Sequence, residues 1–277
     1  MNIIQAIILG IVQGATEFIP VSSSAHLVLF PWALGWPSPG LFFDTMLHWG
    51  TLAAVLVYFW RDWIAIIRGF FRSLGQAGPW SSAPGGRLAD ANNRLAWTII
   101  LGTVPAVILG FLFEDYFESL FSSPTAVGAF LIVTAAILAI SERLGRHRRT
   151  LDRITIVDSL AIGLAQAAAI APGISRSGAT IAAGLGRGLT RDASARFSFL
   201  LGTPAILGAG ILQLFDLLQG AEASTAWPAA IAGMLMAAVV GYLCIKFLLA
   251  YLRRGRLYVF AVYCALVGLT VVIVNLI

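Results

Sequence analysis

Charged side chains are scarce in this sequence. They make up 11% of its 277 residues, against 59% hydrophobic residues, whereas soluble domains carry about a quarter charged residues. The composition excludes an ordinary soluble protein and indicates one integral membrane domain, because no polar segment is long enough to fold separately. The first apolar run begins at Ile3 with no basic residue before it and no A-x-A site, so we expect no cleavable signal peptide.

Cysteine and lysine are nearly absent as well. Cys244 and Cys264 both lie in apolar runs, which predicts packed thiols and excludes a zinc site built on clustered cysteines. The sequence contains neither a Walker A motif nor His-Glu-x-x-His, so the usual nucleotide and zinc-protease sites are excluded. The net charge of +5 reflects arginines in short loops, as in other membrane proteins, and we expect no nucleic-acid partner.

Six stretches are apolar enough to cross a bilayer, which takes roughly 20 residues in a helix. The loops between them alternate in charge: 61–94 is basic, with the turn-rich middle GQAGPWSSAPGG, and 114–124 is acidic. Because arginine-rich loops face the cytoplasm, we expect both termini on the outer side of the membrane. The predicted spans are 44–60, 95–113, 125–141, 197–215, 228–252 and 257–277.

Two further segments must enter and leave the membrane on the same side. Residues 154–185 lie between two basic loops, and roughly 30 residues are too few for two full spans. Residues 1–43 face the same constraint from the outer side. Each segment is therefore predicted to form a re-entrant helical hairpin, broken at Pro20 in the first and at Pro172-Gly173 in the second.

The two hairpins share a sequence pattern. Because the first enters from outside and the second from the cytoplasm, the pattern predicts an all-α membrane protein with an inverted-topology repeat, 1–147 and 148–277. Such repeats hold their site near the midplane between broken helices. The matching pairs are Gly10 with Gly163 and Gln13 with Gln166, 153 residues apart, then Pro20 with Pro172 and Ser23 with Ser175, 152 residues apart.

The stretch PGISRSGAT places Arg176 in the middle of the second hairpin. A helix that starts here presents free N–H groups and a positive dipole end, and the guanidinium fork suits phosphate. The hydroxyls of Ser175, Ser177 and Thr180 add donors, so the stretch predicts a phosphate site. The alternative is a structural Arg176 paired with Glu17, but an arginine at membrane depth indicates function by default.

The first hairpin contributes Gln13 and Glu17, which are four residues apart and share one helix face. Glu17 has three interpretations: it binds a divalent cation, accepts a proton, or pairs with Arg176. Mg²⁺ and Ca²⁺ both take oxygen ligands and commonly serve phosphate chemistry. Gln13 is either a further ligand of that cation or a partner in an interhelical hydrogen bond.

Ser22 and Ser23 precede His26 by four and three residues. In a helix that begins here, either hydroxyl can approach the imidazole, as in a nucleophile-base pair. Alternatively, His26 itself attacks phosphorus or protonates the leaving group. In a purely structural interpretation, the serines cap the helix and His26 is packed.

Asp44 and His48 are also four residues apart, at the beginning of the first predicted span. One interpretation makes them a second shell around a metal ion. The favoured interpretation is an ordinary helix start near the outer surface.

Together these motifs resemble the undecaprenyl-diphosphate phosphatase family, also known for bacitracin resistance. The resemblance covers essentially the whole chain, and FSFLLGTPA at 197–205 also matches. It implies removal of the terminal phosphate from a C55 polyprenyl diphosphate at the outer face of the bacterial plasma membrane, which recycles the carrier lipid for cell-wall synthesis. The motifs that carry it are QxxxE at 13–17, PVSSxxH at 20–26 and PGxSRSGxT at 172–180.

The resemblance also implies roles for individual residues. Glu17 and Gln13 become ligands of Mg²⁺ or Ca²⁺, Ser23 the proposed nucleophile, and Arg176 the phosphate-binding residue, with His26 beside them. Many family members carry Glu where this chain has Gln13, which leaves one carboxylate in the motif, although an amide oxygen is still a ligand. The residues alone leave Ser23, His26 and water open as nucleophiles.

A lipid-phosphate flippase is the chief rival, because inverted repeats with broken helices are a transporter architecture. The membrane phosphatases with Lys-x6-Arg-Pro and Pro-Ser-Gly-His motifs are excluded, since neither motif occurs and Lys246 is the only lysine. The expected partners are a polyprenyl diphosphate and membrane lipids, and the sequence leaves a homodimer open.

Overall fold

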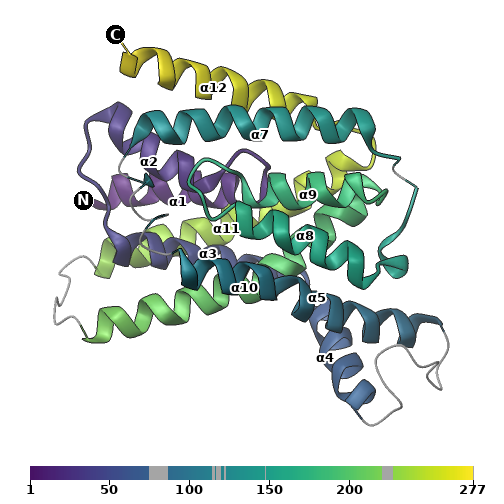
Figure 1. Ribbon diagram of the computed structural model, residues 1–277. Coiled ribbons are helices and arrows are strands. Elements are labelled where there is room, and N and C mark those ends of the chain that lie inside the picture. The colour runs from purple at the N-terminus through teal and green to yellow at the C-terminus, as the bar shows by residue number, and fades with distance from the viewer. Residues whose placement is uncertain are drawn as a thin grey trace.

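The computed structural model describes residues 1–74, 87–113, 116, 120–121, 123–146, 148–219 and 227–276. The predicted turn-rich linker at 75–86, most of the acidic loop and His147 lie outside this part. Within it the chain forms eleven α-helices and a short 3-10 turn, η1, with no strand longer than an isolated bridge (Figure 1). The helices outside the predicted spans are α1 (Ile3–Phe18), α2 (Ser23–Leu34), α4 (Trp60–Leu74), α8 (Ile156–Ala168) and α9 (Arg176–Gly186), and η1 is Leu151–Arg153.

Six described helices are long and apolar enough to cross a membrane, and each overlaps one predicted span, so that prediction is confirmed. The α5 helix begins eight residues before its predicted span, and α10 begins six residues before the predicted stretch. The early start of α10 has a local cause. Thr190 explains this, because its hydroxyl accepts a hydrogen bond from the Ala193 N–H and starts the helix early. The six are α3 (Leu41–Tyr58), α5 (Arg87–Leu112), α7 (Pro124–Leu144), α10 (Arg191–Gln219), α11 (Trp227–Leu252) and α12 (Tyr258–Leu276).

The prediction of a loop over 61–94 is wrong in part, because α4 occupies its first half. Three residues of α4 face α5: Ile66, Gly69 and Ser73 are buried. The Trp97 indole of α5 donates to the Ser73 hydroxyl at 2.9 Å. The arginines that suggested a loop project from the other faces of this amphipathic helix, so packing against α5 stabilises it.

Paired glycines set three close helix crossings. A Cβ on Gly10 of α1 would overlap the carbonyl oxygen of Gly233 in α11, so a side chain there would push the two helices apart. Small residues let backbones in apolar surroundings approach this closely. The crossings of this kind are Gly10 with Gly233 (α1–α11), Gly102 with Gly163 (α5–α8) and Gly128 with Gly268 (α7–α12).

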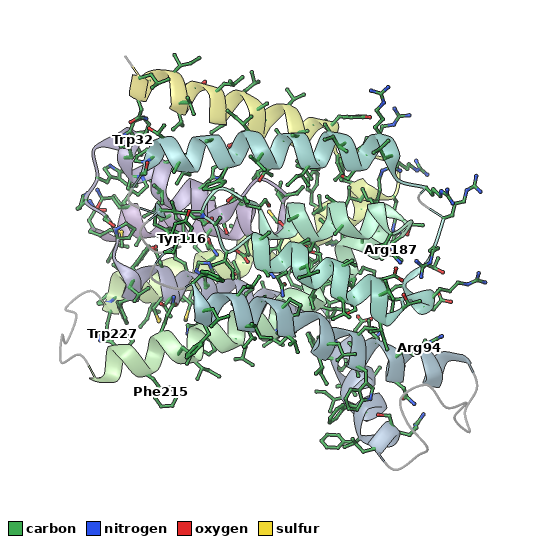
Figure 2. The ribbon with its side chains drawn as sticks, in the orientation of Figure 1. Trp32, Arg94, Tyr116, Arg187, Phe215 and Trp227 are labelled. Atoms are coloured by element: carbon green, nitrogen blue, oxygen red, sulfur yellow. The ribbon has the colours of Figure 1, made fainter. Side chains whose placement is uncertain are left out.

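Two helical hairpins occupy opposite halves of the molecule and meet at their tips (Figure 1). The first is α1 and α2, and the second is α8 and α9. Both termini lie at the end that carries the first hairpin. The labelled Arg94 and Arg187 lie at the other end, opposite Trp32 and Trp227 (Figure 2).

Asp158 organises the arginine-rich end. It is fully buried and accepts from Arg149 at 2.6 and 3.1 Å and from Arg187 at 2.8 Å. It also closes a capping box with Thr155 at the start of α8. The hydrogen bonds with Asp158 raise the pKa of the Arg149 guanidinium, so this cluster keeps its charges.

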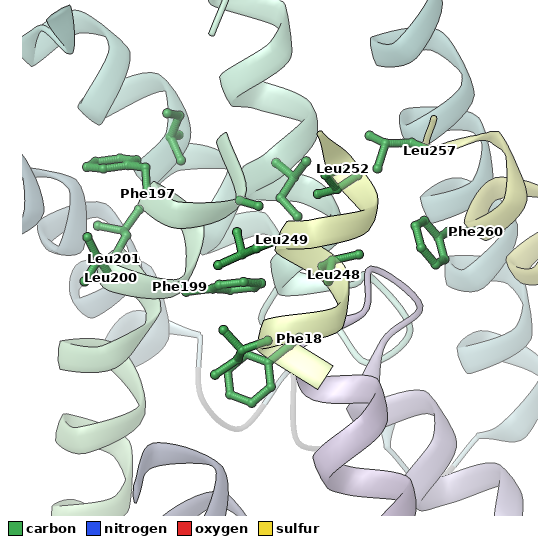
Figure 3. Packing of buried hydrophobic residues seen from close by; sticks show 14 of the residues in the cluster. Phe18, Phe197, Phe199, Leu200, Leu201, Leu248, Leu249, Leu252, Leu257 and Phe260 are labelled. Carbon is green, nitrogen blue, oxygen red and sulfur yellow. The ribbon is translucent and has the colours of Figure 1, made fainter. Parts of the chain in front are cut away.

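An apolar core lies directly behind the first hairpin tip (Figure 3). Phe18, the last residue of α1, meets the Phe199 ring edge-on at a centroid distance of 5.3 Å. Both side chains are 1% exposed. This packing fixes the end of α1 and therefore the position of the neighbouring Glu17.

Candidate active site

Both hairpin tips turn through a residue with positive φ. These are Ser22, at φ +73°, and Gly173, at φ +101°. The helix starts predicted near them are confirmed, since α2 begins at Ser23 and α9 at Arg176. Positive φ is costly for serine, and such strain is characteristic of functional sites.

Serine side chains cap both of these helices. The Ser22 hydroxyl accepts from the Ala25 N–H at 3.3 Å, and the Ser175 hydroxyl accepts from the Gly178 N–H at 3.0 Å. The remaining N–H groups of the two first turns leave two positive helix ends at the place where the hairpins meet.

Direct hydrogen bonds join the two tips. The Gly173 N–H donates to the Ser24 hydroxyl at 3.5 Å, and the Ser177 hydroxyl donates to the Ile19 carbonyl at 3.4 Å. Thr134 of α7 braces the second tip, because its hydroxyl donates to the Gly173 carbonyl at 2.9 Å and accepts from the Ser175 N–H at 3.0 Å. No sequence pattern indicated these contacts of Ser24 and Thr134.

Glu17 is the centre of the polar cluster at these tips. Its Oε1 accepts from Arg176 Nη2 at 2.6 Å, which is an ion pair between the two hairpins. Its Oε2 accepts from the Ser23 hydroxyl at 2.6 Å and from Gln13 Nε2 at 3.1 Å. Glu17 is only 6% exposed, so these bonds compensate a charge held away from water.

Two polar atoms of this cluster are buried without a hydrogen-bond partner in the described part of the chain. They are Gln13 Oε1 and Arg176 Nη1. The ion pair with Glu17 therefore uses only some of the five guanidinium donors. Buried polar atoms without a partner, here one donor and one acceptor, are the pattern expected where a ligand completes a site.

His26 does not pair with a serine hydroxyl. Its Nδ1 lies 2.7 Å from the Ser22 carbonyl oxygen and its Nε2 lies 2.7 Å from the Tyr263 hydroxyl. A carbonyl only accepts, so Nδ1 carries the proton and, in the neutral ring, Nε2 accepts from Tyr263. The serine-histidine approach that the spacing allows is not made, and the Ser23 hydroxyl donates to Glu17 instead.

The remaining predicted phosphate-binding residues divide into two groups. The hydroxyls of Ser175 and Ser177 lie at the tip, 3.3 Å apart. Thr180 lies one turn further along α9 and faces α10, where its hydroxyl is 2.6 Å from that of Ser198. The structure therefore brings the predicted residues to the meeting point of the hairpins, except that His26 and Thr180 each lie one turn further along their helix and face α12 and α10.

A family model described as bacitracin resistance protein BacA matches residues 6–270 of this chain. The chain belongs to the BacA family. It is 44% identical over 276 residues to an undecaprenyl-diphosphatase of Desulforudis audaxviator, covering 100% of this chain and 99% of the relative. It is 46% identical over 274 residues to an undecaprenyl-diphosphatase of Moorella thermoacetica, covering 99% and 98%. The resemblance stated from the motifs is confirmed.

One neighbour of the site in this BacA-family chain, Tyr263, escaped the sequence interpretation, and another, His48, was considered but not favoured. His48 of α3 has its Nε2 3.9 Å from Glu17 Oε2, whereas the favoured interpretation of Asp44 and His48 was an ordinary helix start. The four-residue spacing between Asp44 and His48 was the sequence signal that could have identified His48 as a site residue. Tyr263 stands 237 positions from its partner His26 in the last helix, and no local pattern marks it.

Proposed function

We propose that this chain hydrolyses undecaprenyl diphosphate to undecaprenyl phosphate and inorganic phosphate. Full-length similarity to proteins named undecaprenyl-diphosphatase supports the substrate. The observation that carries the proposal is the hydrogen-bonded cluster of the buried Glu17 with Ser23 and Arg176, built from both hairpin tips. Phosphoryl transfer mainly requires positioning and neutralisation of charge, and this cluster supplies both.

The second tip binds the terminal phosphate. Arg176 contributes the donors that Glu17 does not use, and the first turns of α2 and α9 contribute backbone N–H groups. Ser22, Ser175 and Ser177 line the same place, and their hydroxyls rotate to donate once a phosphate is present. Thr180 contributes indirectly, because its hydrogen bond to Ser198 holds α9 against α10.

Ser23 is the nucleophile that the geometry favours. Its hydroxyl already donates to Glu17 Oε2, which accepts the proton as the Ser23 oxygen bonds to the terminal phosphorus. The bond between that phosphorus and the bridging oxygen breaks, and undecaprenyl phosphate leaves. Water then hydrolyses the phosphoserine and releases inorganic phosphate. His26 positions the tip, since its Nδ1 holds the Ser22 carbonyl in the strained turn.

Glu17 and Gln13 would hold a divalent cation, Mg²⁺ or Ca²⁺. Their fit to one rests on Gln13, whose side chain contacts the Glu17 carboxylate through Nε2 and whose buried Oε1 has no partner. No three His, Cys, Asp or Glu side chains of the described chain converge on one point, so substrate phosphate and water would complete the ligand set, as is usual for Mg²⁺. When bound, such a cation neutralises the charge of the diphosphate.

In the membrane, the two hairpins are re-entrant. Each belongs to one half of an inverted repeat, whose halves are residues 1–147 and 148–277. The glycine crossings support this, because each hairpin packs on a helix of the opposite half. The α1 helix of the first half packs on α11 of the second, and α8 of the second half packs on α5 of the first. The arginine-rich end faces the cytoplasm, which puts both termini outside. The site opens to the outer face of the bacterial plasma membrane, where it recycles the carrier lipid.

Phosphate release from a polyprenyl diphosphate by the purified protein in detergent tests this function. We expect release that needs Mg²⁺ or Ca²⁺ and that falls at least 100-fold in Arg176→Ala and Glu17→Ala. Arg196→Ala is the matched control, because Arg196 pairs with Asp62 away from the tips. Folded wild type that binds the lipid but releases no phosphate would contradict hydrolysis and favour the flippase.

A further inference from the structure

We propose that His48 is a direct nitrogen ligand of the divalent cation, beside Glu17 and Gln13. This inference rests on the proposed function for the presence of a cation at Glu17. It begins from His48 Nε2, which lies 3.9 Å from Glu17 Oε2. The His48 side chain is 34% exposed, whereas that of Glu17 is 5% exposed, so the imidazole is the more accessible of the two groups.

The other nitrogen of His48 determines which atom carries the proton. Nδ1 lies 2.7 Å from the backbone carbonyl oxygen of Asp44, one turn earlier in α3. Because a carbonyl oxygen only accepts, Nδ1 is the N–H donor, and Nε2 of the neutral ring has a free lone pair. A backbone carbonyl that orients a metal-binding imidazole through its other nitrogen is a common arrangement in metal sites.

Two acceptor atoms, His48 Nε2 and Glu17 Oε2, therefore face each other. Their separation exceeds the 2.7–2.9 Å that is usual for a charge-assisted N–H···O bond. Two ligand atoms that each lie about 2.1 Å from a shared ion are separated by about 3 to 4 Å. The observed 3.9 Å therefore fits a bridging cation better than a direct hydrogen bond.

Gln13 is a third acceptor at the same carboxylate. Turning its amide over exchanges nitrogen for oxygen at nearly the same positions and brings an oxygen about 3.1 Å from Glu17 Oε2, where Nε2 now lies. The buried Gln13 Oε1 has no hydrogen-bond partner in its present orientation. An amide oxygen from α1 and an imidazole nitrogen from α3 would then both lie within 4 Å of Glu17 Oε2.

This ligand set changes the preferred metal. Gln13 leaves the QxxxE motif with one carboxylate, and the His48 imidazole supplies the further donor. Ca²⁺ is held by sets of 6–8 oxygen atoms, whereas imidazole nitrogen favours transition ions. The site is therefore selective for Mn²⁺ over Ca²⁺, and that selectivity depends on residue 48.

Electron paramagnetic resonance with Mn²⁺ alone, on the full-length protein in detergent without lipid substrate, tests the ligand directly. We expect electron spin-echo modulation from a directly bound ¹⁴N in the wild type. His48→Gln should remove it and weaken Mn²⁺ binding about tenfold or more, with Ca²⁺ binding changed less than about twofold. The modulation should persist in His26→Gln, the histidine control.

Mn²⁺ binding that depends on Glu17 but gives no ¹⁴N modulation in the wild type would overturn the proposal, and so would the absence of Mn²⁺ binding. The wild-type spectrum decides this even where a variant folds poorly. Phosphate release, measured separately, distinguishes the two proposals. Nitrogen-coordinated Mn²⁺ without phosphate release defeats the hydrolase function alone, and metal-dependent release without modulation defeats the His48 ligand alone.

Discussion

The Tyr263 hydroxyl of α12 lies 2.7 Å from His26 Nε2 of the first hairpin, and the two rings stack at a centroid distance of 5.7 Å and an angle of 9°. The last helix of the chain therefore braces the histidine whose other nitrogen holds the Ser22 carbonyl. The orientation of the first hairpin tip thus depends on a residue near the C-terminus.

Replacing Tyr263 with Phe should slow hydrolysis by about tenfold while KM changes less than about twofold. The change keeps the stacked ring but leaves His26 Nε2 without its donor, which costs about 1 kcal/mol and loosens the tip. Steady-state phosphate release provides the rates, and ¹⁵N shifts of labelled histidine report the tautomer. Tyr242→Phe is the matched control, because Tyr242 has a ring contact with Tyr58 at another place. Equal rates in the two variants would contradict the positioning role of His26.

Replacing Gly202 of α10 with Ala should displace Arg176 and so disable the proposed phosphate site. A Cβ on Gly202 would overlap Nη1 of Arg176, so the guanidinium must move away from Glu17 or α10 must shift. We expect kcat/KM to fall by about tenfold or more. Gly208→Ala, in the same helix, has nothing within 4 Å of its new Cβ and should retain wild-type activity. If Gly202→Ala retained it too, Arg176 would not need its observed position.

Replacing Gly163 with Ala should destabilise the fold without touching the polar cluster. The new Cβ would overlap the Gly102 carbonyl oxygen where α8 crosses α5. Overpacking of this kind costs about 1–3 kcal/mol, which unfolding in detergent by heat or denaturant measures. Gly110→Ala meets only the Ile170 side chain, at 3.6 Å, and should unfold like the wild type. An unchanged midpoint in Gly163→Ala would mean that the two helices separate easily.

Replacing Asp158 with Asn should lower stability by about 2 kcal/mol, because the change removes the charge that Arg149 and Arg187 share and weakens the cap of α8. The two arginines are partly exposed and can turn to water, which keeps the loss moderate. Unfolding midpoints measure it, with Asp192→Asn at the start of α10 as the control. Both variants should retain phosphate release per folded molecule, and a selective loss of catalysis in Asp158→Asn would contradict a purely structural role.

Much of the architecture is readable in the sequence because it depends on local properties. Length and hydropathy determine the six spans, and the break in each hairpin follows from Pro20 and Pro172. Serine next to those breaks predicts where α2 and α9 begin. The pairing of Glu17 with Arg176, considered as a structural alternative, forms in fact and leaves a guanidinium donor free.

The sequence by itself determined a helical membrane protein with broken hairpins and polar residues at the breaks, since composition, turn residues and helix starts act over a few positions. Only the tertiary structure decided that Tyr263 meets His26, that His48 faces Glu17, and that residues 60–74 form a helix on α5. The physical reason is that each of these depends on contacts between segments far apart in the chain. A side chain's partner at that range is set by how whole helices pack, which no short pattern encodes.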